Sequence, residues 1–365
     1  MHTTITLAAK MKRLSIIMIV LPLLLACGKD RNFEQNAVPM AFSTIEKRLV
    51  TRTDYVDKPV DQTVLHTVHN QISLFGVLVE NEETPATKTT TKIFDNIPLE
   101  CTSVTAPTPP ATTYTSVWEY TPLRYWQDDV HYYFTGVFPY HASYVTMDNE
   151  YFVNVQYYPG SNDDLMIARG YRYVESGGKS PVALAFNHAT SAVRFLFGTA
   201  SDTGSDYKIT SFRIEDVAQN GTLKVASQST SNPAIVSGNW TPAGRGTLAT
   251  WNADIESSRL TVPYPSDSND PEDYLQFGWY YMVPQTLVST SAIRFSVSYR
   301  GGDPVETLLP FYGAVDQYDE TGTSWIPNCV YSYFVTITQS GLNITVKTTP
   351  WDEVEVTTED ILFQG

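Results

Sequence analysis

The sequence predicts an all-β protein with two tandem β-sandwich domains behind an N-terminal leader. Three observations support this prediction. Short runs of β-branched and aromatic residues, many with a period of two, recur through the chain. Turn-forming clusters rich in Gly, Pro, Asn and Asp separate them. After the leader, no amphipathic segment reaches three helical turns. The expected strands are 72–79, 130–138, 151–157, 182–186, 193–197, 209–214, 260–262, 293–299, 331–337 and 342–346.

The leader has the order of an export signal. Lys12 and Arg13 precede an apolar run at 14–25, and the small residue Ala26 stands directly before Cys27. A positive end, a short apolar core and a small residue at the cleavage position are typical of a signal peptide. The run is too short for a bilayer, which takes about 20 residues. The Leu-Ala-Cys ending resembles a bacterial lipobox, which predicts a lipidated Cys27 and a protein that works outside the cytoplasm.

Length and composition narrow the classes of function. A chain of 365 residues exceeds what one core usually serves, which favours two domains. The formal charge is −15, and removal of the leader's three basic residues makes it −18. Such a surface has no basic stripe for phosphates and argues against nucleic acid as a partner.

The two cysteines that follow the leader, Cys101 and Cys329, lie far apart in the sequence. We expect two unpaired thiols there, with a disulfide as the alternative.

The strongest internal boundary is the Ser/Gly-rich segment 175–180, which lies between two apolar runs. Asn220-Gly221 is a further turn signal. The Thr/Pro-rich stretches 84–91 and 102–113 are expected to be loops. The predicted intervals are a signal peptide with lipobox at 1–27, a lipid tether, first strand and pro-segment at 28–53, sandwiches at 54–177 and 178–350, and a C-terminal tail at 351–365.

No catalytic constellation emerges from the sequence. The segment 178–180 reads Gly-Lys-Ser but lacks the first glycine of a phosphate loop, and a strand follows where a helix is required. His66 and His69 are three residues apart, which is not a same-face interval on a strand. Acidic pairs such as Asp163-Asp164 fit an acidic surface better than the facing carboxylates of a glycosidase. We therefore predict no enzyme, no metal site and no cofactor.

A dense aromatic block between Trp118 and Tyr140 has two interpretations. As a surface platform, its rings would stack on a sugar. As cross-strand pairs, they would form the core of a sandwich. We favour the core and assign Trp126 and His188 to structure.

The segment after the tether has the pattern of a removable edge strand. Val38, Met40 and Phe42 share one face, and Pro39 between them lacks an amide hydrogen, which suits a sheet edge. Loss of the strand would expose three apolar side chains worth about 1.5–3 kcal/mol each. The open groove would then favour a strand from another chain.

Two arginines follow this strand at once. Basic residues in a loop after an edge strand form a natural protease site, which makes Arg48 and Arg52 candidates for cleavage.

In the C-terminal tail, Val354 and Val356 are at even positions, whereas Ile361 and Phe363 are at odd positions, so one straight strand would place the two pairs on opposite faces. Two strand segments joined by a bend at 357–360 would reconcile them. From these residues alone, the tail is a donor strand, a closing strand of its own domain, or a frayed end.

Together these features resemble the fimbrillin-like proteins, the type V pilins of Bacteroidota and their minor-subunit relatives. The resemblance covers nearly the whole mature chain and depends on the order of the pieces. These are the lipobox at Cys27, the strand 38–42 followed by Thr51-Arg52, the aromatic motifs at 125–134 and 138–140, and the runs 164–168, 182–195 and 325–333.

The resemblance implies two transthyretin-like sandwiches, export as a lipoprotein to the outer membrane, and removal of the first strand by an arginine-specific protease. Polymerisation by donor-strand exchange would follow. On this chain, Cys27 would carry the lipid, and Arg52 would be cleaved in preference to Arg48. Val38, Met40 and Phe42 would form the displaced strand. The donor strand would come from the tail with Val354, Val356, Ile361 and Phe363.

We therefore expect a structural subunit, major or minor, of a cell-surface fimbrium that supports adhesion and biofilm formation. Its partners would be other fimbrial subunits, the maturation protease and the outer membrane. The alternative is a surface lipoprotein that binds glycans and never polymerises. Such a protein would keep residues 37–45 in place and expose a cluster of Trp and Tyr on one sandwich.

Overall fold

The computed structural model describes residues 38–46, 65–106, 115–161, 163–175, 179–201, 206–232, 235–253, 259–268, 270–313, 322–338 and 341–350. Strands dominate this part of the chain. Its helical segments are short 3-10 turns at Pro159–Ser161, Ser237–Asn239 and Pro271–Asp273. The prediction of an all-β chain is confirmed. Within the same residues, no helix has the length and apolar character needed to span a membrane.

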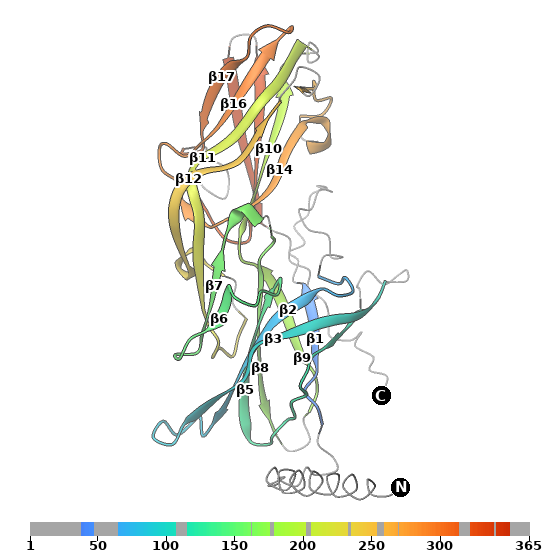
Figure 1. Ribbon diagram of the computed structural model, residues 1–365, viewed down its shortest axis with the longest axis vertical. Coiled ribbons are helices and arrows are strands. Elements are labelled where there is room, and N and C mark those ends of the chain that lie inside the picture. The colour runs from blue at the N-terminus through green and yellow to red at the C-terminus, as the bar shows by residue number, and fades with distance from the viewer. Residues whose placement is uncertain are drawn as a thin grey trace, which may run out of the picture. The chain divides into compact units, whose positions relative to one another are not determined.

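The first sheet has the order β1-β9-β8-β5-β2-β3-β4. Both faces of its central strands are covered, since alternate residues of β2 enter two different cores. Leu74 packs in one core with Phe134, and Val77 packs in the other with Tyr133. The strands are β1 Phe42–Glu46, β2 Gln71–Glu80, β3 Thr89–Thr105, β4 Thr115–Glu119, β5 Val130–Phe138, β8 Met166–Val174 and β9 Val182–His188 (Figure 1).

The second sheet is built around the long strand β11. Its order is β17-β16-β11-β7-β6, and β12 and β13 also pair with β11. The beginning of β11 pairs with β16, and its end pairs with β7. The strands are β6 Val145–Met147, β7 Phe152–Tyr157, β11 Tyr207–Ala226, β12 Trp240–Asn252, β13 Leu260–Thr261, β16 Ala292–Tyr299 and β17 Val305–Pro310.

A four-stranded sheet has the order β14-β10-β19-β20, in which β10 and β19 are parallel. Rings join it to the second sheet. The centroid of the Phe195 ring of β10 lies 5.2 Å from that of Phe212 of β11, and the centroid of Phe197 lies 4.9 Å from that of Phe295 of β16. β15 (Gln285–Thr286) and β18 (Ser324–Trp325) form a small separate pair. The four strands are β10 Ser191–Thr199, β14 Leu275–Met282, β19 Cys329–Thr338 and β20 Gly341–Pro350.

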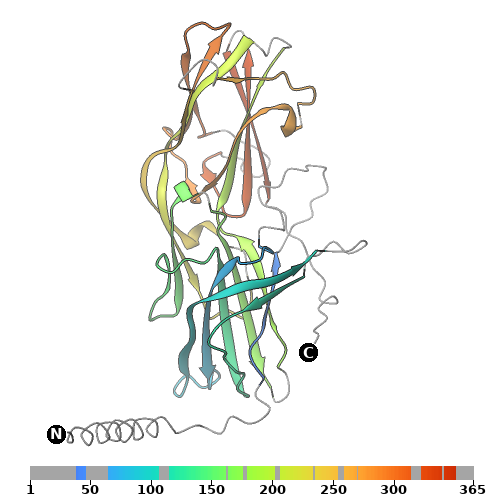
Figure 2. The ribbon, with the colours of Figure 1, turned by 45° about the vertical axis from the view of Figure 1, so that its right-hand side comes forward.

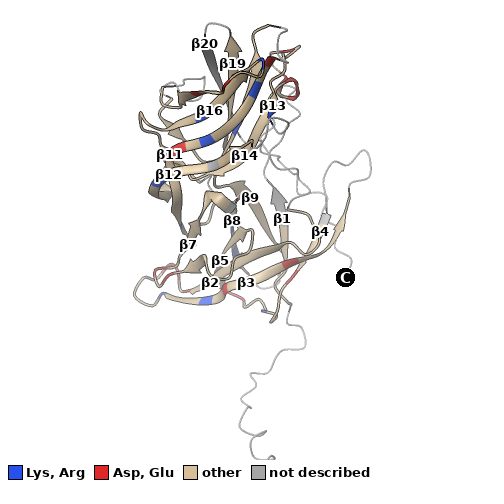
Figure 3. Cartoon of the chain, turned by 45° about the horizontal axis from the view of Figure 1, so that its top comes forward, with Lys and Arg blue, Asp and Glu red and all other residues tan. Residues whose placement is uncertain are grey.

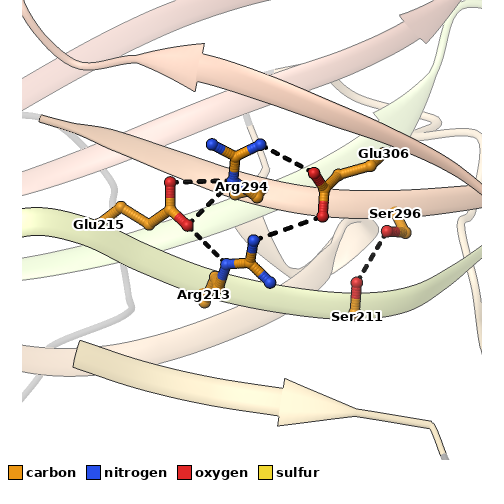
Figure 4. A network of polar contacts seen from close by, with 6 residues as sticks. All are labelled: Ser211, Arg213, Glu215, Arg294, Ser296 and Glu306. Atoms are coloured by element: carbon orange, nitrogen blue, oxygen red, sulfur yellow. Dashed lines mark hydrogen bonds and ion pairs between the residues drawn. The ribbon is translucent and has the colours of Figure 1, made fainter. Parts of the chain in front are cut away.

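Charged residues of both signs lie along β11 (Figure 3). Two of them, Arg213 and Glu215, form a network with Arg294 of β16 and Glu306 of β17. The Glu215 carboxylate accepts from Arg213 at 2.6 Å and from Arg294 at 2.9 Å. Glu306 of the edge strand β17 accepts from Arg294 at 2.8 Å and from Arg213 at 3.4 Å (Figure 4). The network ties this edge strand to its two neighbours.

Two strands pair across the expected boundary after residue 177. β9 follows the boundary in the sequence but pairs with β8 in the first sheet, where Met166 lies opposite His188. β7 precedes it but pairs with β11, where Tyr157 lies opposite Gly221. The limits of the two sandwiches stay a prediction.

The turn expected at Asn220-Gly221 is wrong, because both residues lie inside β11. A Cβ atom at Gly221 would stand 2.7 Å from Val283 Cγ1, so this glycine serves close packing instead of a turn.

Candidate functional site

The edge strand β1 is attached to the first sheet differently from the other strands. It pairs in parallel with β9, with Phe42 opposite Val182 and Glu46 opposite Phe186. The other pairs of this sheet in the described residues are antiparallel. β1 is also terminal in the strand order, so its ladder has a single partner. These features make it the strand of this sheet that is simplest to remove.

Phe42 fixes β1 to the core. The residue is 6% exposed, and its ring meets three others edge-on. The ring centroid lies 5.1 Å from Phe134, 5.8 Å from Phe94 and 5.8 Å from Tyr120. Edge-to-face pairs at such distances add stability beyond the area they bury. We call these three rings together with β9 the β1 seat.

The backbone next to Phe42 is held from both sides. The Met40 amide donates to the Arg124 carbonyl at 2.8 Å, and the Val182 amide donates to the Ala41 carbonyl at 3.0 Å. The Tyr120 hydroxyl donates to the Met40 carbonyl at 3.0 Å. Burial raises the pKa of Tyr120, so the hydroxyl stays a donor at neutral pH. β1 therefore lies between β9 and the segment that follows β4.

This position follows from the course of β3. The strand pairs with β2 as far as Glu100 and then continues to Thr105, where β4 pairs with it, and its course is oblique to β5, β8 and β9 (Figures 1 and 2). β4, the last strand in the order, contacts β1, the first. Without β1, the sheet would be open between its two edge strands, with Phe94 and Phe134 at the gap.

Two of the three residues expected to face the core do so. Met40 is 4% exposed and packs in the same core as Phe42. The expected burial of Val38 is wrong, since this side chain is 39% exposed. The alternation extends back from Phe42 to Met40, whose amide donates to the Arg124 carbonyl, but it does not reach Val38. The other predicted site residues lie outside the described residues: Cys27, Arg48, Arg52, Val354, Val356, Ile361 and Phe363.

The aromatic block is mostly core and not a surface platform. Trp118, Trp126, Tyr132 and Phe134 are all at least nine-tenths buried. Trp126 meets Tyr132 edge-on at 4.9 Å. The prediction that these rings form a sandwich core is confirmed.

Other groups with chemical potential have structural surroundings. His188 Nδ1 lies 3.0 Å from an Asp164 oxygen, and both side chains are buried at the end of β9. Nδ1 of His66 is 2.9 Å from the Ser116 hydroxyl, and Nδ1 of His69 is 3.0 Å from Glu100. In the part of the chain that the structure describes, no group of three His, Cys, Asp or Glu residues is placed to hold a metal ion.

The two described cysteines do not pair. Cys101 and Cys329 are both buried and form no disulfide with each other, and they belong to different core clusters. Burial raises the pKa of the Cys101 thiol, which keeps it protonated and unreactive at neutral pH.

Sequence reasoning missed the partners that hold β1. Phe94, Tyr120, Arg124 and Phe134 are distant from Phe42 in the chain, and no local pattern relates them to it. The clustering of aromatic residues around 118–134 was the available signal, and it indicated a core without indicating which strand the core receives.

Comparison with known proteins gives one family and several distant structures. A model of the fimbrillin-like family matches residues 59–351. No curated protein matches the chain. A solved fimbrial protein from Bacteroides vulgatus is 14% identical, covering 86% of this chain and 99% of its own, with a TM-score of 0.49. Two solved proteins described as cell adhesion proteins match 86% of this chain and 98% of their own chains. The protein from Bacteroides uniformis is 14% identical and has a TM-score of 0.48. The protein from Bacteroides ovatus is 13% identical and has a TM-score of 0.49.

Proposed function

Because the chain belongs to the fimbrillin-like family, we propose that it is a structural subunit of a cell-surface fimbrium that polymerises by protease-triggered donor-strand exchange. The single observation that carries the assembly step is the attachment of β1, an edge strand in parallel pairing that inserts Phe42 into the core, with Met40 directly before the strand buried in the same core. The role is structural, without catalysis, and it supports adhesion and biofilm formation.

Burial energies explain why an emptied β1 seat would accept another strand. Met40 and Phe42 contribute about 1.5–3 kcal/mol each, or roughly 3–6 kcal/mol together. This is an appreciable share of the roughly 5–15 kcal/mol by which native proteins are stable. Loss of β1 would also leave the Arg124 carbonyl and the Tyr120 hydroxyl without their partners on Met40. The cut protein therefore gains most from a strand with apolar residues two positions apart.

The C-terminal tail has this spacing twice, at Val354 and Val356 and at Ile361 and Phe363. We assign it as the donor strand for a neighbouring subunit. The spacing and the terminal phenylalanine of Ile361 and Phe363 match those of Met40 and Phe42. The tail of one copy would thus fill the seat of the next, and repetition of this contact would build a filament.

The remaining steps concern export and maturation. Cys27 would carry the lipid that holds the precursor at the outer membrane. An arginine-specific protease would then cut after Arg52 or Arg48 and release the first strand. The partners of the mature subunit are other fimbrial subunits.

Cleavage by an arginine-specific protease tests the proposal. We expect the cut protein to form oligomers that resist dilution and appear as filaments in electron micrographs. The matched control is the double variant R48K/R52K, which keeps both charges but removes both arginine sites. Complete cleavage of the native chain that leaves only monomers at high concentration would contradict polymerisation.

A tail deletion distinguishes the donor from the acceptor. A chain lacking residues 354–363 should fold, accept a tail from an intact copy after cleavage, and fail to donate its own. Mixed with cut intact protein, it should shorten the filaments because it ends each growing chain. If this truncation does not fold, the tail closes its own domain instead.

A further inference from the structure

A small pocket opens beside the hairpin of β6 and β7, away from the β1 seat. Its volume is about 280 Å³. Tyr144 directly precedes β6, and Tyr158 directly follows β7. The antiparallel pairing of Val145 with Val155 brings these two tyrosines to the same end of the hairpin. Their ring centroids are 5.4 Å apart, and each residue is 44% exposed.

The rim of this pocket is held in place by hydrogen bonds. The Asn96 side-chain amide donates to the carbonyls of His141 and Val145, both at 3.0 Å. The His141 amide donates to the Ser73 hydroxyl at 3.2 Å. The Gln156 amide donates to the Tyr144 carbonyl at 2.8 Å. A ligand would therefore meet a preformed rim and would lose little binding energy to ordering it.

Polar groups surround the two rings. His141 stacks on Tyr144 with centroids 4.1 Å apart, and its Nδ1 accepts from the Tyr144 amide at 3.3 Å. The neutral imidazole then carries its proton on Nε2, where it can act as a donor. Gln156 and Asp163 also line the pocket. Buried Val145, Val155 and Leu165 line its apolar part.

We propose that this pocket binds a neutral carbohydrate through one terminal sugar ring. The apolar C–H face of a pyranose can pack on the partly exposed rings of Tyr144 and Tyr158, and its hydroxyl groups match the acceptor Asp163 and the donor His141. The volume is at the lower end for small-molecule sites, which fits one ring and not an extended ligand. Among the residues that line the pocket, Asp163 is the charged one, which disfavours acidic sugars.

This binding site goes beyond the proposed assembly, because it shares no residue with Met40, Phe42 or the tail. It can therefore be tested on the uncut chain. Saturation-transfer NMR and calorimetry would use the methyl glycosides of glucose, galactose, mannose and N-acetylglucosamine, with N-acetylneuraminic acid as the acidic comparison. We expect at least one neutral glycoside to bind, and the acidic sugar to bind more weakly or not at all.

Substitutions then locate the site. Y158A and Y144A should each weaken binding by about tenfold or more, which corresponds to about 1.4 kcal/mol. Y158F keeps the ring and should bind nearly as the native chain does. D163N should weaken binding because the amide is a poorer acceptor for hydroxyl groups than the carboxylate. Y312A removes a tyrosine of similar exposure, 47%, that does not line the pocket, and should leave binding unchanged.

Three outcomes would overturn the proposal. The first is that no neutral glycoside binds. The second is that Y144A and Y158A, shown to be folded by their unfolding curves, bind as tightly as the native chain. The third is that these variants leave sugar binding intact but weaken oligomers of the cut protein, which would make the pocket a contact between subunits. A failure of strand exchange alone leaves the sugar-binding measurements valid, since these use the uncut chain.

Discussion

Phe42 carries a large share of what holds β1 to the protein. Its ring touches three other rings, whereas the hydrogen bonds of the neighbouring backbone contribute only about 1 kcal/mol each. A substrate for strand exchange needs such a distribution of energy. A single deep anchor gives the uncut chain a stable fold, and in the proposed assembly the same cavity would select a donor strand with one large apolar residue.

Substitution of this anchor has a definite expected cost. F42A should lower the free energy of unfolding by about 3–5 kcal/mol, because truncation of a buried phenylalanine leaves a cavity. The matched control V38A changes an exposed side chain in the same segment and should stay within about 0.5 kcal/mol. Denaturant unfolding of the uncut chain measures both. Equal stability of the two variants would mean that β1 is not anchored through Phe42.

Buried tyrosines predict a loss of stability in alkali. Burial raises the pKa of Tyr132 to about 12 and that of Tyr280 to about 12, above the usual value of about 10. Folding therefore favours their protonated form. The corresponding stability is fully present below about pH 10 and is lost as pH rises through about 12.

Denaturant unfolding at a series of pH values from about 9 to about 12 would measure this loss of stability, and the absorbance of tyrosinate would show which fraction of the tyrosines is ionised. Y132F should flatten the dependence, because it removes one of the shifted groups. Full ionisation of the tyrosines near pH 10 with the fold intact would contradict the expectation.

At this scale, the sequence predicted what a strand pattern can show. A period of two placed Met40 and Phe42 on the core face, and the structure buries both. It could not show where the strand begins, and so it misassigned Val38. It also could not show that Tyr120 and Arg124 reach Met40, because contacts between distant segments arise only when the sheet curls.

At the scale of elements, the edge strands β17 and β1 are held to their sheets by different kinds of interaction. β17 is tied to β16 and β11 by the Arg213, Glu215, Arg294 and Glu306 network. Exposed ion pairs are worth about 0–1 kcal/mol each, so this network secures register and discourages pairing with other chains more than it adds stability. β1 is instead held by buried rings. Removal of β1 exposes buried apolar surface, whereas the side chains of β17 are themselves exposed or only partly buried.

Most strands were predictable, and the misses have physical causes. β5 and the core of β2, β9 and β19 were expected from apolar runs. The Thr-rich stretches expected as loops contribute residues to both ends of β3, because threonine is β-branched and suits a strand as well as a loop. The parallel pairing of β1 with β9 was not predictable, since the pattern of a strand does not name its neighbour.

At the scale of the whole molecule, strand pairing crosses the expected domain boundary in both directions. The end of β11 pairs with β7, and β9 joins β8 and β1 in the first sheet. One core cluster includes Phe75 and Val77 from the first interval and Val283 and Val330 from the second. The two intervals thus share both hydrogen bonds and apolar contacts.

Separate expression of the intervals 54–177 and 178–350 tests how far they depend on each other. We expect each fragment alone to lack cooperative unfolding, because the first loses β9 and the end of β11, and the second loses β7 and β8. Mixing the two should restore a cooperative transition, since β9 then pairs with β8, and β7 with the end of β11; β1 is absent from both fragments. Circular dichroism of each fragment and of the mixture, followed through thermal unfolding, measures this. If both fragments unfold cooperatively on their own, residue 177 ends an independent domain. The pairing of β9 with β8 and that of β7 with β11 would then be contacts between two independently folded sandwiches.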